Sequence, residues 1–259
     1  MKKTILLILL TAGFRLAAQQ LTLDEILDGF ERSIAIPDAT ATLSVKLIAV
    51  NGEEREIVAK AYQKQISDVQ VDRLFLFDEP ASVRDTGILI HSFMNGDENV
   101  MWIYLPAVKR VKRVALATSG GGYFMGSDFA YSDFIAKSRD DFIQEYLGVT
   151  VLDGTPCYTV KEYGKTLRQR QELKQSYMIN YYRTTDFIMF GRDYYDLAGD
   201  LLKEYRVKKS VNLGGPYVYP TKIEMLNRQT GHKSVIEFTE LSTDSIPERY
   251  FSNRFLQTR

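Results

Sequence analysis

Residue types that carry most catalysis and metal binding are scarce in this 259-residue chain. Its two histidines, His91 and His232, each lie in a strand-like segment, and neither has the His-x-x-x-His or Cys-x-x-Cys spacing of a metal site. A serine–histidine–acid arrangement through either histidine is not indicated by any spacing, which favours a structural role for both. We therefore expect no metal and no cofactor.

Three further features suggest chemistry, and each has a simpler explanation. Cys157 is the only cysteine, which excludes an intramolecular disulfide and favours burial as a small apolar side chain. The acidic pairs at 140–141 and at Asp193 with Asp196 resemble hydrolase carboxylates, but surface turns often contain such pairs. Residues 120–122 are glycines without the Gly-Lys-Ser/Thr ending of a phosphate loop. The sequence does not indicate an enzyme.

The N-terminus resembles a secretory signal peptide. Lys2 and Lys3 precede an apolar run that is too short to span a membrane, and the small residues Ala17 and Ala18 follow. We expect residues 1–18 to be removed on export. The mature protein is then periplasmic, with no lipid anchor because no cysteine lies near the cleavage point.

Export would change the charge balance. Residues 1–18 contain three basic residues and no acidic one, so 33 basic and 33 acidic residues become 30 and 33. This mildly acidic balance argues against nucleic acid as a partner, because such binding depends on an excess of Lys and Arg. No later segment approaches the roughly 18 consecutive apolar residues of a membrane span. Residues 19–259 also lack a linker or repeat, which favours a single domain.

One helix and many strands are predicted. Thr22 and Glu25 have the spacing of a capping box, and apolar residues then recur with helical periodicity until Pro37. Segments 41–50 and 55–65 alternate with period two around an Asn51-Gly52 turn, which predicts a hairpin. Further strands are expected at 69–77, 87–94, 99–105, 148–162, 174–182, 186–195, 201–210, 217–227 and 232–241.

The connections between these strands are short, which favours antiparallel neighbours. A sheet of about eleven strands tends to curl, so the predicted fold is mainly β: a large curved antiparallel sheet forming an incomplete barrel. The interruption at 120–147 is interpreted as one or two short helices, with an apolar stripe at Phe142, Ile143, Tyr146 and Leu147. This helical lid and the N-terminal helix would cover the concave side and enclose a pocket.

Segment 102–133 resembles the periplasmic lipoprotein-carrier fold, most closely the outer membrane lipoprotein-sorting proteins. The resemblance is carried by the aromatic strand WIYLPA at 102–107, the basic run KRVKR at 109–113 and the segment FMGSDFAYSD at 124–133. Shorter matches follow in order at 154–158, 177–190, 199–203 and 220–225. The resemblance implies a concave apolar half-barrel with a lid, which accepts acyl chains from one envelope component and delivers them to another. It also implies an arginine that locks the lid, for which Arg73 and Arg84 are candidates by region only.

Three groups of site residues are predicted. The lipid-binding cavity is assigned to Phe75, Phe77, Trp102 and Tyr104. The lid is assigned to Phe124, Met125, Phe129 and Phe134, with methionine supplying a pliable contact. Head groups or a protein partner are expected at Lys109, Arg110, Lys112 and Arg113. Core packing is the alternative for the aromatic groups, and a solvated strand edge is the alternative for the basic run.

The main hypothesis is a monomeric periplasmic carrier that shields acyl chains of lipoproteins or other lipids during transfer towards the outer membrane. Its candidate protein partners are an inner-membrane transporter and an outer-membrane acceptor. An alternative is a cargo-free accessory subunit that docks to an inner-membrane lipid transporter. A lipid hydrolase would instead require His91 or His232 for activity.

Overall fold

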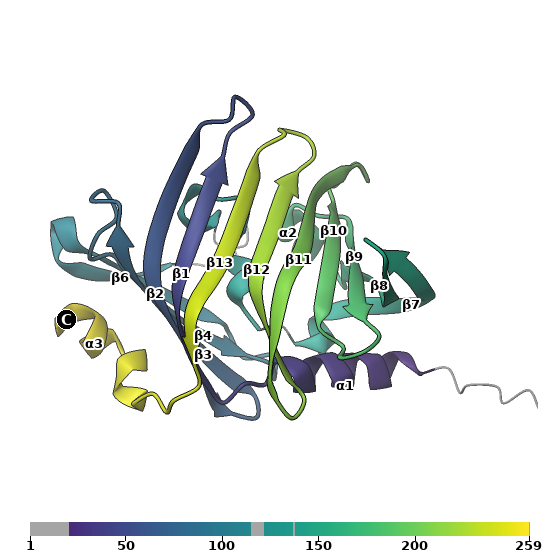
Figure 1. Ribbon diagram of the computed structural model, residues 1–259, viewed down its shortest axis with the longest axis horizontal. Coiled ribbons are helices and arrows are strands. Elements are labelled where there is room, and N and C mark those ends of the chain that lie inside the picture. Colours follow the sequence, from purple (N-terminus) through teal and green to yellow (C-terminus); the bar gives the residue numbers. More distant parts are fainter. Residues whose placement is uncertain (1–20, 115–121, 137, 259) are drawn as a thin grey trace, which may run out of the picture.

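In the computed structural model, described for residues 21–114, 122–136 and 138–258, thirteen strands form one antiparallel sheet (Figure 1). The expected signal peptide lies outside these residues, as do Gly120 and Gly121. The strands are β1 (Asp38–Ile48), β2 (Glu54–Ser67), β3 (Gln70–Glu79), β4 (Gly87–Phe93), β5 (Val100–Leu105), β6 (Arg110–Val114), β7 (Phe142–Leu152), β8 (Thr155–Gly164), β9 (Tyr177–Arg183), β10 (Met189–Tyr195), β11 (Leu201–Gly214), β12 (Tyr217–Asn227) and β13 (Lys233–Ser242).

The order across the sheet is β6-β5-β4-β3-β2-β1-β13-β12-β11-β10-β9-β8-β7. The first and last strands pair in the middle, so one meander runs to the edge at β6 and another to the edge at β7. Both flanks curl to the same side without closing, which confirms the incomplete barrel (Figure 1). The chain between β6 and β7 must therefore connect the two edges of the sheet.

The sheet has thirteen strands where about eleven were expected, and two local differences account for this. The single strand expected over 148–162 is two strands, β7 and β8, because Asp153 and Gly154 take positive φ values of 48° and 80° and reverse the chain. The basic run, which lies outside the strands predicted from periodicity, contains the edge strand β6, paired with β5. The apolar stripe at 142–147 is also not helical. It begins β7, with Phe142 buried and Ile143 exposed on opposite faces.

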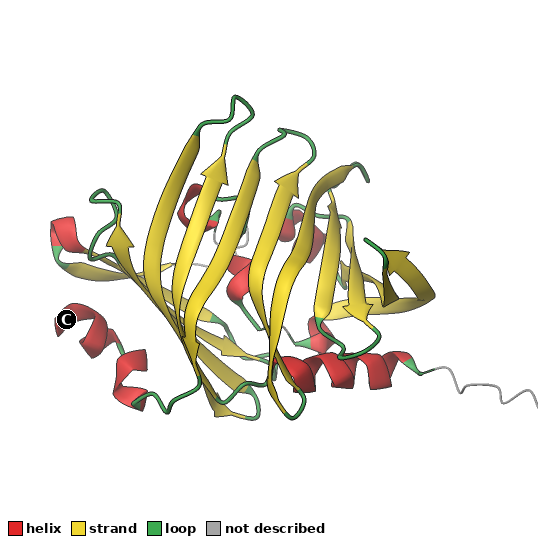
Figure 2. Ribbon diagram, in the orientation of Figure 1, coloured by secondary structure: helices red, strands yellow, loops and turns green. Residues whose placement is uncertain are grey.

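Helices are few and short. They are α1 (Leu23–Ile34), α2 (Leu167–Leu173) and α3 (Asn253–Thr258), with 3-10 turns η1 (Pro106–Val108), η3 (Phe124–Gly126), η4 (Tyr131–Phe134), η5 (Arg139–Asp141) and η6 (Glu248–Phe251). The turns η3 and η4 belong to the segment that lies behind the sheet in Figure 2. None of the helices in the described ranges is long and apolar enough to cross a membrane.

Helix α1 begins at the predicted capping box. Glu25 N donates to Thr22 Oγ1 at 3.3 Å, and Thr22 N donates to Glu25 Oε2 at 2.8 Å. Its apolar face packs on Val160 of β8 and Tyr182 of β9. Gly29 lets Phe187 approach the helix, since a Cβ there would lie 2.5 Å from the ring. The helix therefore sits firmly against the β8–β9 end of the sheet.

The C-terminal segment covers part of the convex face. Leu256 of α3 and Phe251 of η6 are buried with Leu74 and Leu89, on the side of β3–β5 opposite to the concave face. Trp102 lies beside Leu89 in the strand register and joins this cluster. The tail thus protects apolar convex residues from water.

We predict that Leu256→Ala lowers the free energy of unfolding by about 2–5 kcal/mol, because a fully buried leucine is replaced by a cavity. Chemical denaturation monitored by Trp102 fluorescence measures it. Leu197→Ala, at a position 54% exposed, is the matched control and should change stability by about 0.5 kcal/mol or less. Equal stability of the two variants would show that the tail does not hold the convex face.

Candidate functional site

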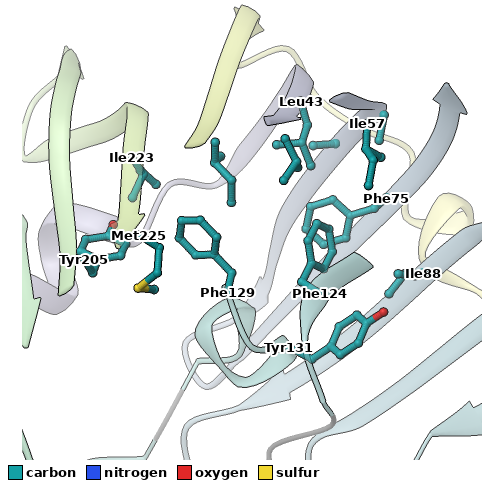
Figure 3. Close-up of a cluster of buried hydrophobic side chains, with 14 of the residues drawn as sticks. Leu43, Ile57, Phe75, Ile88, Phe124, Phe129, Tyr131, Tyr205, Ile223 and Met225 are labelled. Carbon is teal, nitrogen blue, oxygen red and sulfur yellow. The ribbon is translucent and has the colours of Figure 1, made fainter. Parts of the chain in front are cut away.

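Aromatic side chains from residues 124–134 fill the concave face. Phe124 and Phe129 are 0% and 2% exposed and belong to a cluster that spans strands from β1 to β13. Figure 3 shows both rings pointing into this cluster, Phe124 beside Phe75 and Phe129 towards Met225. Ring centroids are 5.3 Å apart for Phe75–Phe124 and 6.4 Å apart for Phe129–Tyr205. The concave surface is therefore covered by the chain itself.

The predicted lid residues all lie in this cluster. Phe134 packs on Phe124, with centroids 4.4 Å apart, and on Phe75 at 5.5 Å. Met125 is partly buried against the same cluster. Tyr131 completes it at 5.6 Å from Phe124 and was not predicted from the sequence.

The four predicted cavity residues divide between the two faces of the sheet. Phe75 and Phe77 face the concave side and are 3% and 1% exposed. Trp102 and Tyr104 face the convex side, under the C-terminal segment. The concave residues of their strand are Met101 and Ile103. A strand buried on both faces shows no polar–apolar alternation, so the sequence could not separate them.

The backbone of residues 122–135 is hydrogen-bonded mainly to itself. Phe124 N donates to Phe129 O at 2.7 Å, and Tyr131 N donates to Gly122 O at 3.0 Å. The hydrogen bonds that we find from this segment to the sheet instead involve side chains. We call residues 122–135 the plug, because they fill the concave face without adding a strand.

Asp128 is the first polar anchor of the plug. Ser234 Oγ of β13 donates to its Oδ2 at 2.8 Å, and Asp128 N donates to Ser234 Oγ at 2.9 Å. His232 Nδ1 lies 2.5 Å from the same carboxylate oxygen. Asn227 Nδ2 reaches Asp128 Oδ1 at 3.5 Å. This carboxylate is thus held by β12, β13 and the turn between them.

Asp133 is the second anchor. Tyr194 OH donates to Asp133 Oδ1 at 2.9 Å, and Lys203 Nζ lies 3.4 Å from Asp133 Oδ2. Lys203 is 3% exposed and also donates to Asp128 O at 3.0 Å, so it joins both anchors. Burial and the neighbouring Asp133 carboxylate raise the pKa of Tyr194, which keeps its hydroxyl a donor.

Arg73 is the third anchor. Its Nη1 donates to Phe134 O of the plug at 3.0 Å, while its Nε donates to Gln63 Oε1 at 3.0 Å. Desolvation by burial lowers the pKa of Arg73. Arg84, the other candidate for a lid-locking arginine, donates locally to Asp78 O at 3.1 Å. Of these two candidates, Arg73 is therefore the one that contacts the plug.

The strand register places residues of the predicted basic group on opposite faces of the sheet. Lys112 pairs with Ile103 and shares its concave side, whereas Arg113 pairs with Trp102 and shares its convex side. Arg113 Nη2 forms an exposed ion pair with Glu98 Oε2 at 2.8 Å. Lys109 and Arg110 are exposed at the start of the edge strand.

The histidines and the cysteine that were considered as candidate catalytic groups make contacts typical of structural residues. Ser234 and His232 both contact the Asp128 carboxylate, whereas a catalytic serine must contact the histidine. His91 Nε2 lies 3.1 Å from Phe251 O and 3.4 Å from Asp72 Oδ2, under the tail. Desolvation raises the pKa of the buried Cys157 thiol to about 11. No group of three or more His, Cys, Asp or Glu in the described ranges is placed to hold a metal ion.

Several anchor residues were missed by sequence reasoning. Lys203 shares its strand face with Tyr205 and Val207, so a lysine on an otherwise apolar face was the available signal. Asp128 and Asp133 belong to the segment FMGSDFAYSD at 124–133, where each lies next to an aromatic residue or one position away from it. Their partners lie about 60–110 positions away, and only the strand register brings them together.

Comparisons with known proteins agree with this architecture. A family model described as "uncharacterized protein" matches residues 70–258. A solved outer membrane lipoprotein-sorting protein domain from Vibrio parahaemolyticus is 23% identical, with a TM-score of 0.81 over 90% of this chain and 97% of that one. A DUF1329 family protein from Desulfovibrio piger is 22% identical, also with a TM-score of 0.81 and the same coverage.

A LolA superfamily protein from Nitrosomonas europaea is 19% identical, with a TM-score of 0.67 over 91% of this chain and 99% of that one. No curated protein is similar enough in sequence to count as a match. At these identities the structural likenesses establish the fold.

We predict that Asp128→Ala loosens the plug, because the change removes the acceptor for Ser234, His232 and Asn227. Amide hydrogen exchange in residues 122–136 should rise by about tenfold or more, while exchange in β1 and β13 stays protected. Asp68→Ala, on an exposed turn, is the control. Unchanged exchange in the plug would show that Asp128 does not anchor it.

Proposed function

Since this chain belongs to the DUF1329-like family and has the LolA-like fold of outer membrane lipoprotein-sorting proteins, we propose that it is a periplasmic carrier of acyl chains. In this proposal, residues 19–259 form a single carrier domain after removal of residues 1–18. The concave face shields the chains of lipoproteins or other lipids on their way towards the outer membrane. The role is binding and transfer, without a catalytic step.

The observation that carries this proposal is how the plug is attached. Its rings cover an apolar concave surface, yet its backbone hydrogen bonds are internal and its links to the sheet are side-chain contacts. The plug can therefore leave the concave face without breaking a strand pair. Displacement would expose Phe75, Phe77 and Ile103 to an acyl chain, with Phe124, Met125, Phe129 and Phe134 acting as the lid.

The basic edge fits the same role. Lys112 lies on the concave side beside Ile103, at the edge of the sheet where a chain would enter. Together with Lys109, Arg110 and Arg113, it presents positive charge to anionic head groups or to an acidic surface of a donor or acceptor protein. The edge strand would then guide transfer rather than hold the chain.

A second function is favoured by the filled interior itself. A cargo-free accessory subunit of an inner-membrane lipid transporter would keep the plug in place permanently. It would need a stable protein partner, which crosslinking in cells detects. A carrier meets its partners only transiently, and its purified form retains or takes up lipid.

The carrier proposal is tested by native mass spectrometry of gently purified protein and by titration with a fluorescent fatty acid. We expect co-purified lipid and saturable binding of the probe. Complete absence of both, with a stable crosslinked partner, would replace the carrier by the accessory subunit.

Neighbouring residues of β5 identify the binding face. Ile103→Asn should weaken binding of the fluorescent fatty acid by about tenfold or more, because it places an amide on the concave apolar surface. Tyr104→Asn, on the convex side of the same strand, should bind the probe as the unmodified protein does. Both side chains are half-buried, which makes the pair a matched comparison. The reverse result would move the cavity to the convex face.

A further inference from the structure

A cavity of about 140 Å³ lies beneath α1, against β7–β10. Its walls are mostly apolar and include Leu27, Phe30 and Ile34 of α1, with Met189 of β10. Its size suits a head group with a few carbon atoms, since most ligand pockets measure about 300–1,000 Å³.

Two opposite charges line this apolar cavity. Glu162 of β8 and Arg192 of β10 are 5% and 8% exposed. Arg192 Nη2 lies 3.9 Å from Glu162 Oε1, whereas the Arg206–Asp193 pair of the same sheet is separated by 2.7 Å. The two charged groups are close enough to attract each other, but at this distance they do not form a direct hydrogen bond.

Hydrogen bonds hold both groups in place. Gln144 Nε2 donates to Glu162 Oε2 at 2.9 Å, and Arg192 Nε donates to Asn180 Oδ1. Asn180 is 0% exposed, and its Nδ2 has no hydrogen-bond partner within the described part of the chain. A buried donor without a partner is uncommon in folded proteins. Asn180 is not among the residues that line the cavity, so the charged groups that face a ligand there are the Arg192 guanidinium, which also interacts with Tyr194, and the Glu162 carboxylate.

The charges at the cavity sum to zero. The lining residues that carry a charge at neutral pH are Glu31, Arg139, Glu162 and Arg192. Arg139 also pairs with Glu31 and, at 2.7 Å, with Asp28, which ties η5 to α1 beside the cavity. A ligand with net charge would leave that charge uncompensated in an apolar setting, which is unfavourable. A ligand carrying one charge of each sign can pair both.

We infer that this cavity binds the zwitterionic head group of an acyl lipid, with its anionic oxygens at Arg192 and its ammonium group at Glu162. This inference rests on the proposed carrier function and specifies the class of its cargo. The acyl chain would occupy the concave face that the plug vacates.

The test compares three amphiphiles with the same palmitoyl chain, titrated below their micelle concentrations. They are lysophosphatidylethanolamine, which is zwitterionic, lysophosphatidylglycerol, which is anionic, and monopalmitoylglycerol, which is neutral. Native mass spectrometry of the full mature chain gives the relative affinities. We expect the zwitterionic lipid to bind about tenfold or more tightly than either of the others.

The variant Glu162→Gln should lose the preference over the anionic lipid, because the partner of the ammonium group becomes neutral while its shape is kept. Glu172→Gln, on α2, is the matched control and should keep that preference. Equal affinities of the unmodified protein for all three lipids overturn the inference, whether or not the variants fold. A folded Glu162→Gln variant with unchanged preference overturns it as well. Failure of all three lipids to bind would instead overturn the carrier function.

Discussion

The architecture depends on one topological constraint, the path of the chain between β6 and β7. Because β1 and β13 pair in the centre, β6 and β7 become the two edges of an open sheet. The connection between them must pass from one edge to the other, and the plug is its described middle part. A concave apolar face of this size needs a cover. The same connection supplies both the link between the edges and the cover, so covering the face requires no additional domain.

In the proposed carrier, the cover would also limit how tightly cargo is held. A sixteen-carbon chain gains about 12 kcal/mol on burial, at about 0.8 kcal/mol per methylene, which alone corresponds to nanomolar affinity. Displacing Phe124, Phe129 and Phe134 opposes this gain by about 5–9 kcal/mol, at about 1.5–3 kcal/mol for each ring. The difference corresponds to micromolar or weaker binding. In the proposed carrier, cargo and plug would therefore compete for one surface, and this competition would make release to an acceptor feasible.

Features that depend on residues close together in the chain could be predicted from the sequence. The capping box at Thr22 and Glu25, the Asn51-Gly52 hairpin and the curved antiparallel sheet were recognisable because each depends on neighbouring residues or on period-two alternation. Features that depend on long-range register were missed. Trp102 and Ile103 are both apolar, and only the covering of the convex face by Leu256 shows which side each faces. The sequence made Arg73 a candidate for contact with the lid, but its hydrogen bond to Phe134 O is formed only through the folded arrangement of the strands.

The two faces of the sheet are covered by different kinds of contact, and this difference assigns their roles. The tail that covers Leu74, Leu89 and Trp102 packs mainly through apolar side chains, which suits a permanent cover. The plug adds buried polar contacts at Asp128, Asp133 and Arg73, and such contacts contribute more to a defined position than to net stability. In the proposed carrier, opening the plug would require solvation or new pairing of these groups, so they would return it to one register when cargo leaves. On this proposal, the apolar rings would determine how strongly the plug competes with a lipid, and the polar anchors would determine the position to which it returns.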